Sequence, residues 1–265
     1  MPWGPREAFT GLAAFVALLV LTNVVAAGVA AALDFDLRTR DVGDTFEKAG
    51  RIAEYADARL AAAASGEALP SPPELLASQD ALQVLLSVTA VSQAATLAIV
   101  GIVTRRPDRQ LLRDLRLDTF AWSSAWLPLA AVLGAYLLTF AWVAAVERTG
   151  IDWLIPTSTV PYEITRDDLT LAIAAAVTVV GAPVTEELFF RGLLFGGLSR
   201  WGFWPAAGIS GLLFSLVHFD PGSVVPFFLI ALILAWLNWR SRSLWHPIIF
   251  HFLFNAISFS ILAFS

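Results

Sequence analysis

Long apolar runs separated by short polar segments set the pattern of this chain. Each run holds enough apolar residues to cross, or nearly cross, a hydrocarbon core of roughly 30 Å as a helix. The pattern therefore predicts an all-α, polytopic transmembrane helix bundle of about seven spans. The predicted spans are residues 9–33, 81–103, 121–146, 169–199, 203–219, 223–239 and 244–264.

One polar segment is much longer than the others and covers residues 34–80. Its acidic side chains outnumber its basic ones, and the cluster Ser71-Pro72-Pro73 interrupts any helix there. We expect an extramembrane insert after the first span, with an amphipathic surface helix over residues 34–60. No repeat divides the rest of the chain, so residues 1–265 are expected to form a single membrane domain.

Composition agrees with a membrane protein and excludes several kinds of site. Of the 265 residues, 57% are hydrophobic and only 15% are charged, whereas soluble domains have about 25% charged residues. The chain has no cysteine, which excludes disulfides, thiolate nucleophiles and cysteine metal ligands. A net charge of −5 offers no basic surface for nucleic acid, so the lipid bilayer is the expected partner.

Arginine placement predicts the orientation of the chain. Basic residues concentrate in cytoplasmic loops, and the segment 104–118 is rich in arginine. Seven spans threaded from that loop give a multi-pass protein of the cell membrane with a cytoplasmic N-terminus. The acidic insert and the loop before residue 169 then lie outside. The arginines that fall inside are Arg6, Arg105, Arg106, Arg109, Arg113, Arg116, Arg200, Arg240 and Arg242.

Three ionisable side chains interrupt the apolar run 169–198, and they are Glu186, Glu187 and Arg191. Charges in hydrocarbon are costly, so they are neutralised internally or used in function. Glu187 and Arg191 are four residues apart, which predicts an ion pair on one helix face. Glu186 is rotated by about 100° from Glu187 and lacks that partner. A poorly solvated carboxylate of this kind is a candidate general base.

The remaining candidates lie on later helices. His218 ends the run Phe214-Ser215-Leu216-Val217-His218, where Phe214 is expected to pack on the same face. His251 and Asn255 are four apart on the last span, and both can donate hydrogen bonds to a developing oxyanion or to a neighbouring helix. His246, which precedes Pro247, is expected to be interfacial and receives no chemical role.

Together the patterns Glu-Glu-x-x-x-Arg, Phe-x-x-x-His and His-x-x-x-Asn closely resemble the CPBP family of intramembrane proteases. This family is also called the CAAX protease and bacteriocin-processing (Abi) family and includes the Rce1-type endoproteases. The resemblance covers residues 169–258, which would be the catalytic core. It implies a glutamate-dependent, metal-independent endopeptidase acting on a membrane-embedded or membrane-associated protein or peptide, with no cofactor. By position, Glu186 and His218 would activate water, His251 and Asn255 would stabilise the oxyanion, and Glu187 and Arg191 would support Glu186.

Other functions remain open at this point. Glu186, His218 and His251 could instead be ligands of a catalytic zinc ion. Buried charges also occur in proton-coupled or ion-coupled transporters and in non-catalytic binding or immunity proteins. Helix geometry raises one difficulty, because at 1.5 Å per residue Glu186 and His218 lie roughly 20 to 26 Å from the cytoplasmic helix ends and His251 only about 13 Å. Straight helices would not bring these residues together, so tilted or distorted helices are expected.

Overall fold

The computed structural model describes residues 2–32, 58, 61–62, 65–68, 79–120, 122–156, 160 and 162–264. The predicted polar insert and its surface helix lie almost entirely outside the described residues. The described part of the chain is helical, without strands. The predicted all-α polytopic membrane bundle is therefore confirmed.

Long helices are joined by short helical turns. The longer helices are α1 (Pro5–Ala32), α3 (Gln79–Thr104), α4 (Asp108–Asp114), α5 (Leu127–Glu147), α9 (Phe203–Leu216), α10 (Val224–Ser241) and α11 (Trp245–Phe264). Short 3₁₀ helices are η1 (Trp122–Ser124), η2 (Asp152–Leu154), η3 (Tyr162–Arg166) and η7 (Pro221–Ser223).

One continuous helical column carries the predicted acidic site and changes its winding along its length. It alternates between α-helix and π-helix and finishes in a 3₁₀ turn. Its segments are α6 (Asp168–Ala175), η4 (Ala176–Gly181), α7 (Ala182–Glu186), η5 (Glu187–Phe195), α8 (Gly196–Leu198) and η6 (Ser199–Trp201). We refer to residues 168–201 as the central column.

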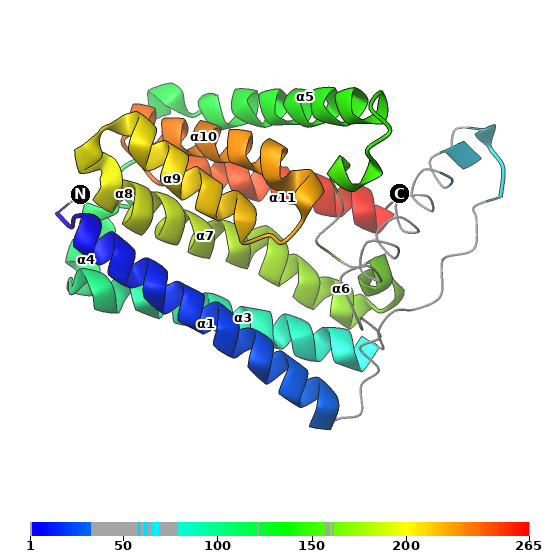
Figure 1. Ribbon diagram of the computed structural model, residues 1–265, viewed down its shortest axis with the longest axis horizontal. Coiled ribbons are helices and arrows are strands. Elements are labelled where there is room, and N and C mark those ends of the chain that lie inside the picture. The colour runs from blue at the N-terminus through cyan, green and yellow to red at the C-terminus, as the bar shows by residue number, and fades with distance from the viewer. Residues whose placement is uncertain are drawn as a thin grey trace.

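Six helical segments in the described residues are long and apolar enough to cross a membrane. The predicted span 203–219 is shorter than expected, because α9 has 14 residues and reaches only about 21 Å at 1.5 Å per residue. Figure 1 shows the N- and C-termini at opposite ends of the bundle. This is expected if α9 also runs from one end to the other, because the six longer segments and α9 together are an odd number of helices.

The central column lies between two groups of helices (Figure 1). On one side α1 and α3 pack against each other and against η5. On the other side are α9, α10, α11 and α5, where α10 contacts α9, α11 and α5. The column is thus surrounded by protein over the stretch that holds Glu186, Glu187 and Arg191.

Packing distinguishes the inside of the bundle from its lipid-facing surface. Phe189, Phe190 and Leu193 of η5 are at most 1% exposed, and the Phe15 ring of α1 stacks on Phe189 with centroids 4.4 Å apart. In contrast, α5 exposes large apolar side chains along one face, which bilayer hydrocarbon would cover. These are Leu129, Leu133, Leu137 and Phe140.

The column begins at a well-formed cap. The Asp167 carboxylate accepts hydrogen bonds from the Thr170 backbone N–H and hydroxyl, both at 2.7 Å, which satisfies the first turn of α6. These bonds hold the pKa of Asp167 below its ordinary value. Gln83 of α3 donates to the same carboxylate at 3.3 Å, so the cap also links the column to its neighbouring helix.

Candidate active site

The acidic motif lies where the central column changes from α-helix to π-helix. Glu186 is the last residue of α7 and Glu187 is the first residue of η5. The short helix α7 therefore separates the two π-helical segments η4 and η5. Pro183 cannot donate a backbone hydrogen bond, and the Thr185 hydroxyl donates to the Gly181 carbonyl at 2.8 Å. Departures of this kind from α-helical winding are frequent at functional sites.

The predicted ion pair between Glu187 and Arg191 is present and fully buried. Arg191 Nη1 donates to Glu187 Oε1 at 3.0 Å, and the two side chains are 1% and 0% exposed. Arg191 Nη2 also donates to the Ala231 carbonyl at 3.4 Å, and its guanidinium lies 4.3 Å from the centre of the Phe214 ring. This cation–π contact and the carbonyl bond compensate the buried charge on the side away from Glu187.

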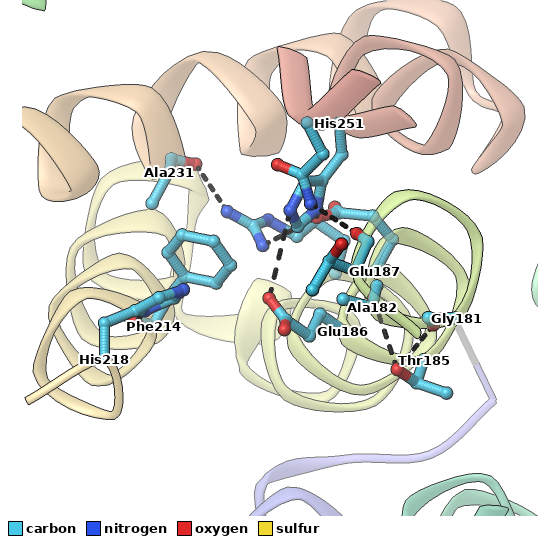
Figure 2. Close-up of polar contacts among 12 residues, drawn as sticks. Gly181, Ala182, Thr185, Glu186, Glu187, Phe214, His218, Ala231 and His251 are labelled. Carbon is cyan, nitrogen blue, oxygen red and sulfur yellow. Dashed lines mark hydrogen bonds and ion pairs between the residues drawn. The ribbon is translucent and has the colours of Figure 1, made fainter. Parts of the chain in front are cut away.

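His251 binds to the same carboxylate oxygen. Its Nδ1 lies 2.9 Å from Glu187 Oε1, and a carboxylate can only accept in this bond. Nδ1 therefore carries a proton, and Nε2 faces Glu186 Oε2 at 4.0 Å. Figure 2 shows His251 above the two glutamates, with dashed contacts to both. Glu187 thus fixes both the ring orientation of His251 and the position of its second nitrogen.

Glu186 differs from Glu187 in its exposure and its partners. Its side chain is 28% exposed, and Oε2 is buried with no hydrogen-bond partner among the described residues. The distance of 4.0 Å between Glu186 Oε2 and His251 Nε2 is too long for a hydrogen bond. A water or a reacting oxygen could bridge these two atoms. Glu186 is therefore the carboxylate of the pair that remains available for chemistry.

His218 lies just past the end of α9 and packs beside Phe214, as the four-residue spacing predicted. The two rings are 4.9 Å apart, and His218 Nδ1 contacts the Phe214 carbonyl at 2.7 Å. Nδ1 must donate to that carbonyl, which leaves Nε2 as an acceptor. In the described residues, no hydrogen bond or ion pair joins His218 to Glu186. The imidazole that the structure brings next to Glu186 is His251.

Asn255 contacts the central column, one turn of α11 beyond His251. Its Nδ2 donates to the Thr178 carbonyl in η4 at 2.8 Å. The π-helical segment therefore presents a carbonyl to α11, and Asn255 ties the two helices together. One Nδ2 hydrogen of Asn255 forms this bond, and the second Nδ2 hydrogen can be donated to a ligand.

Two further buried polar residues make contacts that were not predicted from sequence. His246 lies at the start of α11 and is fully buried, where Ser124 Oγ bonds its Nε2 at 3.0 Å and the Phe120 ring stacks on it. Asn238 of α10 is 3% exposed and donates to the Arg191 carbonyl at 3.4 Å. A lone carboxamide within an apolar helix was the available signal for Asn238.

The zinc hypothesis required Glu186, His218 and His251 to converge. No group of three or more histidine, aspartate or glutamate side chains has the arrangement of a metal site in the described part of the chain. The residues that do meet are Glu186, Glu187, Arg191 and His251. These are two carboxylates, one guanidinium and one imidazole, and all but the partly exposed Glu186 are buried.

Comparison with known proteins agrees with this arrangement. Residues 168–257 match the family described as "Type II CAAX prenyl endopeptidase Rce1-like". The chain is thus a polytopic membrane protein whose residues 168–257 match an Rce1-like domain, in agreement with the CPBP resemblance of its motifs. A protein of Bacillus subtilis (strain 168) described as "Putative membrane peptidase YdiL" is 25% identical over 167 residues, covering 62% of this chain and 67% of that protein. No solved structure matches.

Proposed function

We propose that this protein is an intramembrane, glutamate-dependent endopeptidase that hydrolyses a peptide bond of a membrane-associated protein or peptide. One observation carries the proposal. Glu186 is a partly exposed carboxylate within an apolar helix, and it faces an imidazole whose orientation is fixed by a second, fully buried carboxylate. The family match over residues 168–257 and the similarity to a described membrane peptidase support the same class of activity.

In the proposed reaction Glu186 accepts a proton from water, and the resulting hydroxide attacks the peptide carbonyl. A poorly solvated carboxylate is a stronger base than one in water. The tetrahedral intermediate then collapses as the C–N bond breaks, and the proton held by Glu186 passes to the leaving amine. His218, with Nε2 as acceptor, is assigned to orient the attacking water together with Glu186.

His251 and Asn255 are assigned to the oxyanion. Because Nδ1 of His251 donates to Glu187, its Nε2 can donate to an oxyanion only when the ring is an imidazolium. Glu186, Glu187, Arg191 and a charged His251 then sum to zero net charge, so this state is compatible with a buried site. Glu187 and Arg191 act as positioning residues, because they hold the His251 ring without touching substrate.

The test is a comparison of membrane peptides from cells that carry the wild-type protein or the Glu186→Gln variant. Glutamine keeps the size of the side chain but cannot take a proton, so we expect substrate fragments to fall by about 10²-fold to 10⁴-fold. Glu147→Gln, which changes an exposed carboxylate of α5, is the matched control and should leave the fragments unchanged.

Two results would contradict the proposal. Fragments that persist at the wild-type level in Glu186→Gln would remove the glutamate mechanism. Identical peptide profiles for the wild type and a strain lacking the protein would favour a non-catalytic binding or immunity role, or a transporter that uses the buried charges. Cleavage that purified protein loses on chelation and recovers with zinc would favour the metal alternative.

A further inference from the structure

A polar cavity separate from the candidate active site is lined by residues at the end of the bundle that holds the N-terminus, α4 and α8 (Figure 1). Its volume is about 390 Å³, within the range of sites for small ligands. Arg116, which follows α4, and Arg242, which follows α10, both line it, together with Asn238 and Trp239. No carboxylate is among the residues that line the cavity.

The two arginines form a pair of like charges without a counter-ion. Neither makes an ion pair with a carboxylate within the described residues. Burial, followed by repulsion from Arg242, holds the pKa of Arg116 below its ordinary value. Two cations that line one cavity, without an acidic partner in the described residues, form a site where an anion from outside the chain can bind.

Both arginines also have a positive φ, a backbone conformation that Arg105 and Phe219 share. Arg116 and Arg242 have φ of 58° and 54°, in the left-handed region where glycine is the favoured residue at the end of a helix. Arg242 directly follows α10 in this conformation, and its N–H donates to the Asn238 carbonyl at 3.0 Å.

One residue that lines the cavity also carries an unpaired acceptor. Asn238 is 3% exposed, and its Oδ1 has no hydrogen-bond partner among the described residues. Trp239, on the next position of α10, is 51% exposed, which suits an aromatic side chain at the boundary between lipid and water. The site therefore combines two guanidinium groups, an amide acceptor and an opening at the expected depth of lipid headgroups.

We propose that this cavity binds the phosphate group of an anionic membrane lipid whose headgroup carries hydroxyls. Each guanidinium can donate paired hydrogen bonds to phosphate oxygens, and a headgroup hydroxyl can donate toward Asn238. Because Asn238 also donates to the Arg191 carbonyl, the bound lipid would contact a residue that supports the catalytic column. The proposal stands independently of proteolysis, since it concerns binding alone.

A neighbouring cavity provides the matched control. It has a volume of about 520 Å³ and is lined by Arg6, Arg105 and Arg106, and also by Glu7. Glu7 gives this cavity a carboxylate of its own, and Arg106 is also paired with Asp114 at 3.5 Å. The double variant Arg6→Gln/Arg105→Gln removes the same amount of charge at the same end of the molecule.

The experiment measures lipid binding by native mass spectrometry of the purified full chain, with phosphatidylglycerol and, separately, phosphatidylcholine. We expect the wild type to retain one tightly bound phosphatidylglycerol, with no equivalent retention of phosphatidylcholine. Arg116→Gln/Arg242→Gln should weaken that binding by about tenfold or more, and Arg116→Lys/Arg242→Lys should weaken it less. The control double variant should bind as the wild type does.

Three results would overturn the proposal. The first is equal retention of phosphatidylglycerol by the wild type and Arg116→Gln/Arg242→Gln. The second is an equal loss in the Arg6→Gln/Arg105→Gln control, which would mean that only net charge matters. The third comes from an arm with free glycerol phosphate. If that compound binds in an arginine-dependent way and the lipid does not, the ligand is a soluble phosphate ester.

Discussion

The adjacent residues Glu186 and Glu187 have different environments. Their substitutions should therefore change the free energy of unfolding by different amounts. Glu187 is fully buried and accepts bonds from Arg191 and His251, whereas Glu186 is 28% exposed. Replacing one partner of a buried ion pair leaves the other charge uncompensated, which costs about 3 to 5 kcal/mol. We therefore expect Glu187→Gln to lower the free energy of unfolding by about that amount, while Glu186→Gln changes it little.

Thermal unfolding in detergent, followed by tryptophan fluorescence, measures both variants. The double variant Glu187→Gln/Arg191→Met should recover part of the lost stability, because replacing both charges of a buried pair can be nearly neutral. If Glu186→Gln were instead the more destabilising change, the division of roles between the two glutamates would be reversed.

Substitution of Asn255 can distinguish a structural role of this residue from a chemical one. Its hydrogen bond to the Thr178 carbonyl alone would contribute about 1 kcal/mol to helix association. Removal of an oxyanion donor lowers kcat by about 10²-fold to 10³-fold. We expect Asn255→Leu to reduce cleavage by the larger factor with only a small loss of stability. Measured rates close to wild type, with the same small loss of stability, would leave Asn255 a purely structural residue.

The sequence predicted contacts within one helix more securely than contacts between helices. The ion pair of Glu187 with Arg191 and the packing of Phe214 on His218 followed from spacing of four residues, which is a local property. The contacts of His251 with Glu187 and Glu186 connect residues 64 or more positions apart. They depend on the packing of α11 against the central column, and no periodicity within one helix specifies that packing.

The same limit applies to whole elements, and the central column illustrates it. The apolar run 169–199 predicted one long span, and the column covers residues 168–201. Its π-helical segments η4 and η5 were not predicted, because i→i+5 winding leaves no simple periodic signal in an apolar run. This winding changes the number of residues per turn. Depths and faces calculated for a straight α-helix therefore cannot predict where Glu186 lies relative to His251.

Close contact between α1 and α8 depends on a glycine of the central column. A Cβ on Gly197 would lie 2.8 Å from the Gly4 carbonyl oxygen and 2.9 Å from the Ala8 Cβ, so alanine would push the helices apart. We expect Gly197→Ala to destabilise the protein by about 1 to 3 kcal/mol. A Cβ added to Gly208 of α9 would meet nothing within 4 Å, and Gly208→Ala should be neutral or slightly stabilising.

Unfolding temperatures of the two alanine variants, measured side by side, test this difference. The two substitutions add the same atom to two helical glycines, so helix propensity alone would change both in the same favourable direction. Equal stabilisation of the two variants would show that α1 does not pack closely against α8.

At the scale of the whole molecule, the described helices place the N-terminus and the arginine-rich segment around α4 at one end and the C-terminus at the other (Figure 1). The sequence identified most of the spans, because hydropathy is a property of composition along the chain. It overestimated the length of the span at α9, since the helix stops two residues before His218. The orientation of the bundle across the membrane stays a prediction.

That orientation can be tested in a chain that has no cysteine of its own. Leu112 of α4 precedes α5 and Ile151 follows it, and these apolar residues are 48% and 38% exposed. Because arginine-rich loops stay in the cytoplasm, we expect a membrane-impermeant maleimide to label Ile151→Cys in intact cells but Leu112→Cys only after lysis. The reverse labelling would place the N-terminus outside. It would also move the lipid cavity at Arg116 and Arg242 to the outer leaflet, where fewer anionic lipids are expected.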